Sequence, residues 1–383
     1  MIETILTILV LTASAIAALF TAVATGVICM ASDINGKKKA STVFPKVTIL
    51  KPVKNTDSGF EKNIRSFYEQ DYPQIELVFG VDNENDQCVA ILQQISRDYP
   101  LISTKIVVTG EIKTGNPKID TLSACNADIN GSYVWVTDSN VRVTKNALSQ
   151  LMQEAVETDA KIVFSPIIGA GHKTLASIVE NSYINFFVSG ATLMAWSAFK
   201  KPVITGKSML IEMKTLNERY GGFAYFSNYL AEDYLLGDTF HNDGYRVSTN
   251  NVWITNINEE SSFMQVYKRI ERWAVLRNRL NPFYMFEILT NPLVWIIALL
   301  ASGQYGLGLA LALITALHEY TVLFCINHDD RSSGKVILLY PFACILKGLL
   351  MLTIYFRAFF IGNVQWRGRH IRIGKKTIIT EGV

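Results

Sequence analysis

Residues 132–140 read Ser-Tyr-Val-Trp-Val-Thr-Asp-Ser-Asn, an apolar run that stops at an acid. The run predicts a buried strand, and Asp138 would then lie at its carboxyl end, where α/β sheets bind ligands. Asn140 offers a second oxygen two residues on, and such oxygen ligands suit a hard divalent cation that holds a diphosphate. A strand followed by an ordinary polar turn is the simpler alternative when this stretch is taken alone.

The chain around this stretch alternates between strand-like and helix-like patterns. Apolar runs predict strands at 47–50, 75–81, 105–108, 133–136 and 161–164. Helix-like spacing predicts helices at 61–69, 88–96, 119–127 and 147–156. Regular alternation of the two indicates a mostly parallel sheet with helices on both faces. The predicted fold class is therefore α/β and Rossmann-like.

The composition is typical of a membrane protein with a large water-facing part. Of the 383 residues, 49% are hydrophobic and 18% are charged, and the mean hydropathy is +0.21. The net charge of +3 is too small to indicate a nucleic-acid partner. The cysteines lack the spacing of a zinc site or a disulfide framework, which fits a reducing compartment. They are Cys29, Cys88, Cys125, Cys325 and Cys344.

The N-terminal segment predicts a membrane anchor. Residues 4–31 carry no charge, and the run is long enough to cross a bilayer. A cleaved secretory signal is the alternative, but the start lacks a basic region and the run is longer than such signals need. Lys37, Lys38 and Lys39 follow, and positive charge marks the cytoplasmic side. We expect an anchor at 1–33 and a cytoplasmic domain at 40–280.

Three apolar stretches near 284–301, 305–326 and 336–361 predict a C-terminal membrane region at 281–365, followed by a basic tail at 366–383. Three full crossings from the cytoplasm would leave the basic tail outside, against the positive-inside rule. Either one stretch is re-entrant or interfacial, or the rule fails here.

Polar and charged groups follow several predicted strands and recur further along the chain. They are Leu50-Lys51-Pro52-Val53-Lys54-Asn55, Asp82 to Asp86, Asn116-Pro117-Lys118, Asp138-Ser139-Asn140, Ala231-Glu232-Asp233-Tyr234 and Arg269-Ile270-Glu271-Arg272-Trp273. Acids gathered on one edge of a sheet are unfavourable unless a cation or hydrogen-bond donors bind there. A metal, a lysine and two arginines would together hold a nucleotide diphosphate. Transfer of an attached sugar also needs a base for the acceptor hydroxyl, for which Asp233 is the natural candidate.

The order of these groups resembles that of the inverting family-2 type of glycosyltransferases with a GT-A fold, and more narrowly the ceramide glucosyltransferases of family 21. The matching strings are Leu-Lys-Pro-Val-Lys, Phe-Tyr-Glu-Gln-Asp-Tyr-Pro at 67–73, Asn-Pro-Lys-Ile at 116–119, Asp-Ser-Asn-Val-Arg-Val at 138–143, Ala-Glu-Asp-Tyr and Arg-x-x-Arg-Trp. A DxD-like triplet alone is a weak signal. The full set in this order, from the N-terminal anchor to the Trp-Arg-x-Gly-Arg tail, is a strong one.

The resemblance implies a role for each matching residue. Asp86 would lie in the nucleotide pocket, with Asp82 as its rival, and Lys118 would face the donor phosphates. Asp138 would be the metal-associated acid, and Asn140 stands where the pattern usually has a second acid. The remaining implied site residues are Pro52 and Lys54 for the nucleotide sugar, Asp233 as the catalytic base, and Arg269, Arg272 and Trp273 closing over the diphosphate and the acceptor.

The resemblance also implies a reaction. It predicts transfer of glucose from UDP-glucose to the primary hydroxyl of ceramide, with Mg²⁺ or Mn²⁺ as cofactor and no obligate protein partner. The enzyme would be integral to a membrane, either a bacterial inner membrane or that of the Golgi or endoplasmic reticulum. Another UDP-sugar or another lipid, such as N-acetylglucosamine and a hopanoid, is the nearest alternative. A processive polysaccharide synthase and a non-catalytic receptor or transporter subunit are further alternatives.

Residues 183–199 are apolar within the otherwise polar domain. At 17 residues the stretch is marginal for a membrane span. A crossing here would also place Asp138 and Asp233 on opposite sides of the membrane. We therefore expect an interfacial segment that helps to admit the lipid acceptor. Packing in the domain core is the alternative.

Overall fold

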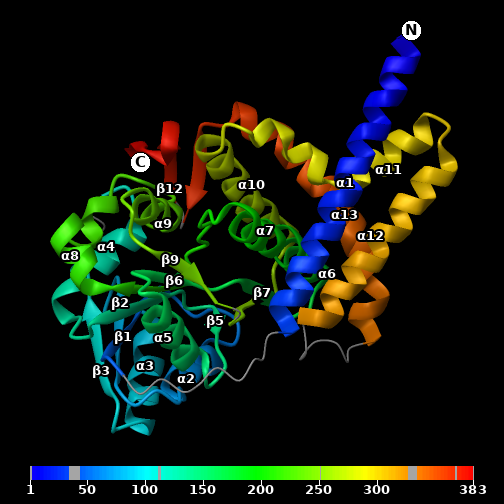
Figure 1. The fold of residues 1–383 in the computed structure, drawn as a ribbon. Coiled ribbons are helices and arrows are strands. Elements are labelled where there is room, and N and C mark those ends of the chain that lie inside the picture. The colour runs from blue at the N-terminus through cyan, green and yellow to red at the C-terminus, as the bar shows by residue number, and fades with distance from the viewer. Residues whose placement is uncertain are drawn as a thin grey trace.

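The structure, a computed structural model, describes residues 2–33, 44–110, 114–250, 252–326, 334–366 and 369–382. An α/β domain occupies one side of the molecule, and long apolar helices stand on the other (Figure 1). Residues 34–43, which include the three consecutive lysines, lie outside the described residues.

The α/β domain is built on a seven-stranded sheet, in the order β3-β2-β1-β4-β8-β6-β9. Its strands are β1 (Val47–Val53), β2 (Ile75–Val81), β3 (Ser103–Val108), β4 (Tyr133–Thr137), β6 (Ile162–Phe164), β8 (Ser208–Glu212) and β9 (Val247–Thr249). Strands β3, β2, β1 and β4 pair in parallel, as do β6 and β9. Strand β8 runs antiparallel to both of its neighbours. The prediction of a mostly parallel α/β sheet is confirmed.

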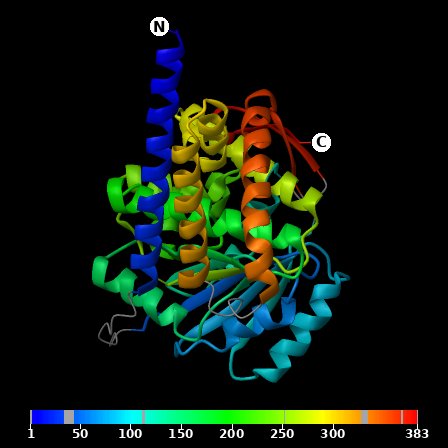
Figure 2. The same ribbon diagram turned by 90° about the vertical axis from the view of Figure 1, so that its right-hand side faces the viewer.

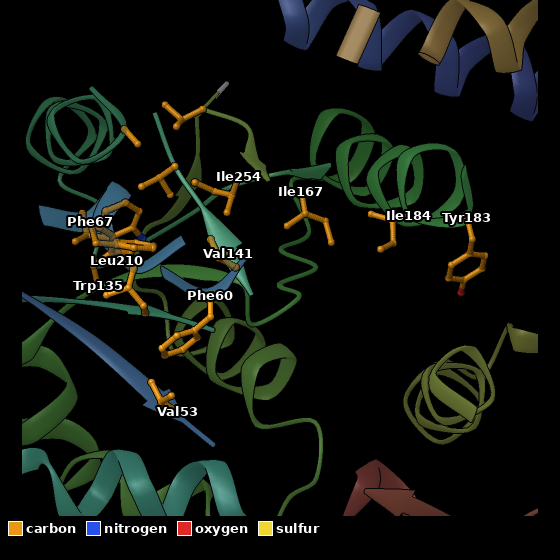
Figure 3. Packing of buried hydrophobic residues seen from close by; sticks show 14 of the residues in the cluster. Val53, Phe60, Phe67, Trp135, Val141, Ile167, Tyr183, Ile184, Leu210 and Ile254 are labelled. Carbon is orange, nitrogen blue, oxygen red and sulfur yellow. The ribbon is translucent and has the colours of Figure 1, made fainter. Parts of the chain in front are cut away.

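Helices cover both faces of this sheet. They are α2 (Phe60–Tyr68), α3 (Gln87–Asp98), α4 (Pro117–Ala124), α5 (Ala147–Thr158), α8 (Met213–Tyr220) and α9 (Glu232–Asn242), with short 3-10 turns η1 (Asn126–Asp128) and η3 (Phe223–Phe226). Successive residues of β4 point to opposite faces, as a strand requires. Trp135 packs against Phe67 of α2 on one face (Figure 3), while Val134 and Val136 belong to the core beneath α4 and α9.

A smaller sheet connects this domain to a long bent helix. The sheet consists of β5 (Val141–Arg142), β10 (Ile254–Ile257) and β7 (Ile167–Ala170), in that order. The helix comprises α6 (Leu175–Tyr183), a π-helical turn η2 (Ile184–Val188) and α7 (Ser189–Phe199), so it includes the apolar segment 183–199. Its middle is buried, and Tyr183 stacks on Trp273 of α10 (Phe263–Leu280). Phe186 packs edge-on against Phe20, and Gly190 lies close to Ala24 and Ile28.

Among the described residues, three helices are long and apolar enough to cross a membrane. They are α1 (Ile2–Asp33), α12 (Tyr305–Ile326) and α13 (Gly334–Phe360). The segment η4 (Tyr284–Thr290) and the helix α11 (Pro292–Ala301) form a pair bent by 67°, which is either a broken span or a re-entrant loop. Helix α12 packs on α1 and α11, whereas α13 packs mainly on α6 and α10 (Figure 2).

The C-terminal tail folds back onto the α/β domain. It forms a three-stranded sheet from β11 (Asn363–Trp366), β12 (Arg369–Ile373) and β13 (Ile379–Gly382), with the short turn η5 (Lys375–Thr377) between the last two. The amide of Leu230 donates to the carbonyl of Thr377 at 3.0 Å, and the amide of Ile379 donates to Asn228 at 2.8 Å. The chain end therefore lies beside α9 (Figure 1).

Candidate active site

The parallel strands bring several predicted residues to one edge of the sheet. Lys54, Asp82 and Asp138 directly follow β1, β2 and β4, whose carboxyl ends lie side by side. Lys54 Nζ lies 2.8 Å from a carboxylate oxygen of Asp82. Pro52 is buried within β1, opposite Gly80 of β2. The sequence prediction of a shared edge is thus supported by the topology.

Asp86 is held by backbone amides at the same edge. One carboxylate oxygen accepts from the amide of Cys88 and caps α3, and the other accepts from the amide of Asn55 after β1, both at 2.9 Å. Burial raises the pKa of Asp86, but these hydrogen bonds outweigh it, so the pKa lies below its ordinary value. Asp86 therefore ties the loop after β1 to the start of α3.

Lys118 is buried and is the centre of a cluster of charges whose acids Asp138 and Asp233 are partly exposed. It lies in the first turn of α4, which begins at Pro117 because the side chain of Asn116 accepts from the amides of Lys118 and Ile119. Its ammonium lies 3.0 Å from Asp138 Oδ1 and 3.8 Å from Glu232 Oε1. Burial lowers the pKa of Lys118, yet the surrounding carboxylates raise it above its ordinary value.

The N-terminus of α9 supplies two further acids to this cluster. Burial, and then the charge of Asp233, raise the pKa of Glu232 to about 7, and burial also raises the pKa of Asp233. Glu232 accepts from the amide group of Asn116 at 2.9 Å. The carboxylate of Asp233 packs against Gly206, so closely that a Cβ there would lie 2.4 Å from Oδ2. Asp138 and Asp233 thus share one site, and a membrane crossing between them is excluded.

Asp138 and Asn140, the expected ligands of a divalent cation, are both bound by a lysine. Lys207 Nζ lies 2.8 Å from Asp138 Oδ2 and donates to Asn140 Oδ1 at 3.0 Å. In the part of the chain that the structure describes, no three His, Cys, Asp or Glu side chains are grouped so as to hold a metal ion. The donor atoms therefore fit an ammonium rather than Mg²⁺ or Mn²⁺, and this geometry does not support the expected metal.

A second lysine fixes the backbone beneath Asp138. Lys51 in β1 is fully buried, and its ammonium donates to Thr137 Oγ1 at 2.7 Å and to the carbonyl of Asp138 at 2.8 Å. It also lies 3.5 Å from the centre of the Phe67 ring. Burial lowers its pKa well below the ordinary value of a lysine. Lys51 therefore orients the end of β4 from within the core.

The two arginines and the tryptophan of the Arg-x-x-Arg-Trp motif on α10 contact different partners. Arg269 forms an ion pair with the buried Glu180 of α6 and donates to Asn258 at 3.2 Å. The guanidinium of Arg272 lies 5.7 Å from the Trp366 ring of the tail, and Trp273 stacks on Tyr183. The structure thus places this motif between α6 and the C-terminal tail. The same tail reaches the acid cluster at Ala231, whose amide donates to Thr377 Oγ1 at 3.3 Å.

Sequence reasoning overlooked Lys207, Gly206 and Thr377. Gly206 adopts a φ of +70°, its carbonyl accepts from Lys118 Nζ at 3.0 Å, and its Cα lies against the carboxylate of Asp233. The string Gly-Lys-Ser before a short apolar strand was the available signal for the first two. This string did not indicate the site because the sequence does not show that β8 pairs antiparallel with β4. That pairing places Lys207 beside Asp138. Nothing in the sequence of the tail indicates Thr377.

The match to a family model decides the assignment. Residues 7–379 match the model described as glycosyl transferase family 21. The chain belongs to glycosyltransferase family 21. It is therefore an enzyme of the glycosyltransferase class, and the α/β domain with its edge of acids and lysines is a GT-A domain. The non-catalytic alternatives are excluded, and the cluster of charges around Lys118 is its candidate active site.

Individual relatives agree with the family. Ceramide glucosyltransferase 3 of Caenorhabditis elegans is 23% identical over 344 residues, which cover 87% of this chain and 74% of that protein. Ceramide glucosyltransferase of Komagataella phaffii is 32% identical over 121 residues, or 30% of this chain and 24% of that protein.

Solved structures give a weaker likeness. A mannosyltransferase from Pyrobaculum calidifontis in complex with GDP-Man and Mn²⁺ covers 88% of this chain and 99% of its own, with a TM-score of 0.48 and 19% identity. TarS of S. aureus (residues 1–349) in complex with UDP-GlcNAc has a TM-score of 0.41 and 14% identity, at the same coverage.

Proposed function

We propose that this enzyme transfers glucose from UDP-glucose to the primary hydroxyl of ceramide at a membrane surface. The observation that carries the proposal is the cluster in which the buried Lys118 pairs with Asp138 and with Glu232 of α9, beside the charge of Asp233. The family assignment, the ceramide glucosyltransferases among the relatives and the apolar helices support the lipid acceptor. Another UDP-sugar or another membrane lipid is the alternative within the same chemistry.

The donor would bind along the edge formed by β1, β2 and β4. In this proposal Pro52, Lys54, Asp82 and Asp86 surround the nucleotide, and Lys118 faces the diphosphate. The ion pair of Lys54 with Asp82 and the caps made by Asp86 hold these two loops in place before the donor arrives. A site that is preorganised in this way loses less conformational entropy on binding.

The transfer step needs a base and a charged pocket for the leaving group. Asp233 would take the proton of the acceptor hydroxyl as the oxygen attacks the anomeric carbon from the face opposite the diphosphate. The bond from that carbon to the diphosphate then breaks, and UDP leaves with the electron pair. The raised pKa of Asp233 makes its carboxylate a stronger base than the carboxylate of an exposed acid. Burial raises the pKa of the neighbouring Glu232 as well.

The acceptor would arrive from the bilayer on the side of α6, η2 and α7. This long helix is buried against α1 and α12 along its middle, while Phe199 at its end is 79% exposed. Segment 183–199 is thus proposed to link the membrane helices to the reaction site. Arg269, Arg272 and Trp273 lie on the neighbouring helix α10 and would close over the diphosphate and the acceptor once both are bound.

The proposed orientation places the domain and the tail together in the cytoplasm. The tail is hydrogen-bonded to the domain through the amides of Leu230 and Ile379, which supports a common side of the membrane for both. In this proposal an even number of full crossings separates them, so at least one of the three apolar stretches after residue 280 does not cross. The pair bent by 67° and α13, which packs along α6 and α10, are the two candidates.

A donor and acceptor panel tests the proposal. Purified protein in lipid nanodiscs would receive several UDP-sugars with ceramide, other membrane lipids or a soluble sugar, and mass spectrometry would identify the products. We expect hexosylceramide from UDP-glucose, and none from Asp233→Asn. Asp238→Asn, on the same helix but outside the cluster, is the matched control and should retain activity. A product only on another lipid, or a growing polysaccharide, would replace ceramide in the proposal.

A further inference from the structure

We propose that Lys207 takes the place of a divalent cation in this active site. Its ammonium, together with that of Lys118, would meet the negative charge of the leaving diphosphate. This inference rests on the proposed function for the identity of the donor, a nucleoside diphosphate sugar. It concerns a residue that lies outside the motifs by which the resemblance was identified.

The position of Lys207 is the first argument. Its ammonium lies between the two oxygen atoms that the Asp138-Ser139-Asn140 triplet offers, at 2.8 Å from Asp138 Oδ2 and 3.0 Å from Asn140 Oδ1. Charge-assisted N–H···O bonds have about this length, so Lys207 occupies the oxygens that a divalent cation would use. The site is thus shaped around a lysine side chain.

The fold fixes Lys207 in this position. Strand β8 runs antiparallel to β4, and Ser208 pairs with Thr137, so the residue before β8 faces the residue after β4. Ser208 is itself held by Trp135, whose indole N–H donates to its hydroxyl at 2.9 Å. The Lys207 side chain is 15% exposed. Lys207 therefore starts from a rigid strand and has little room to leave.

Lys118 and Lys207 act on the same carboxylate. Lys118 binds Asp138 Oδ1 and Lys207 binds Oδ2, while the carbonyl of the intervening Gly206 accepts from Lys118. These two ammonium groups raise the local positive charge to the level that one divalent ion would supply. A divalent ion at the same oxygens would have to displace Lys207 against the repulsion of Lys118.

Asn140 fits this arrangement better than a second acid would. Its carbonyl oxygen accepts one hydrogen bond from Lys207 and adds no charge, so the ion pair of Lys207 is made with Asp138. A carboxylate at position 140 would attract a divalent ion more strongly. The asparagine in place of the second acid of the DxD pattern and the lysine at position 207 therefore both favour an ammonium over a divalent ion at this site.

Isothermal titration of the full-length protein with UDP tests this inference without using catalysis. The wild type, Lys207→Met and Lys207→Arg would be titrated in EDTA and again in Mn²⁺. Lys214→Met, an exposed lysine on α8, is the control. We expect wild-type affinity to change by less than about twofold between the two conditions. Lys207→Met should lose about tenfold or more in EDTA and recover with Mn²⁺, because the ammonium that occupies Asp138 Oδ2 and Asn140 Oδ1 is then gone and the ion can bind there.

Lys207→Arg keeps a cation and should keep metal-independent binding, which separates loss of charge from a folding defect. Wild-type protein that binds UDP only with Mn²⁺ overturns the inference and leaves the proposed function standing. Equal affinity of the wild type and Lys207→Met in EDTA also overturns it. If the wild-type protein binds no UDP in either condition, both the inference and the proposed UDP-sugar donor are contradicted. Metal-independent UDP binding without any lipid product supports the inference and contradicts the proposed acceptor.

Discussion

Substitution of Gly206 by alanine would test whether the position of the Asp233 carboxylate sets the rate of transfer. The added Cβ would lie 2.4 Å from Asp233 Oδ2 and 3.0 Å from Lys118 Nζ. Ordinary contact begins near 3.4 Å, so the carboxylate has to move by about 1 Å. It has little freedom to do so, because Oδ1 accepts from the amide of Tyr234 at 2.8 Å.

Two effects of different size follow from this change. Alanine at a φ of +70° costs about 1–2 kcal/mol of folding free energy, since its Cβ approaches the following carbonyl oxygen. A misplacement of about 1 Å at a reacting group can lower the rate on the order of 10²-fold. We therefore expect a kcat reduced about a hundredfold in Gly206→Ala, with only a modest loss of stability.

Gly221→Ala separates the two effects. Gly221 has almost the same φ, +71°, but no atom lies within 4 Å of the position of its Cβ. Both variants should lose similar free energy of unfolding in a denaturant titration, while only Gly206→Ala should lose transfer in an assay at saturating UDP-glucose and ceramide. Equal kcat values for the two variants would refute the idea that the contact with Gly206 positions the base.

Three further outcomes follow from the same contacts. Because burial raises the pKa of Asp233, the proposed base, the acidic limb of kcat/KM should lie above the range near pH 4 where exposed acids titrate, and a limb confined to about pH 4 would contradict this assignment. Thr377→Val removes the oxygen that accepts from the Ala231 amide and should lower kcat about tenfold, whereas Thr377→Ser keeps that oxygen and should keep kcat. Equal kcat values for the two variants would show that the tail does not position α9. Arg269→Ala leaves the fully buried Glu180 without its ion pair and should lower the free energy of unfolding by about 3–5 kcal/mol. An unchanged midpoint in a denaturant titration would disprove this.

Local patterns were sufficient to predict the domain and one edge of the site. The strand that ends before Asp138 and the helix that begins after Asn116 are both set by neighbouring residues, namely an apolar run and a side-chain cap. Parallel pairing then brings the ends of β1, β2 and β4 together. Asp82, Asp138 and Lys54 could therefore be placed on one edge before any coordinates were known.

The parts that could not be predicted depend on contacts between distant segments. Lys207 meets Asp138 only because β8 inserts antiparallel to β4, and the sequence before β8 does not show its direction. The turn after Gly374 places a threonine, Thr377, at a φ of +61°, where the sequence would lead us to expect glycine, and contacts with Leu230 and Ala231 stabilise it. The side of the membrane on which the tail lies was undecided for the same reason.

A structure of the protein with bound UDP, determined in lipid nanodiscs, tests the central claim most directly. The account predicts the diphosphate within about 3.2 Å of the Lys118 ammonium, at the edge formed by β1, β2 and β4, with the Asp233 carboxylate facing the terminal phosphate. UDP bound elsewhere, with Lys118 still paired only to Asp138 and Glu232, would contradict it.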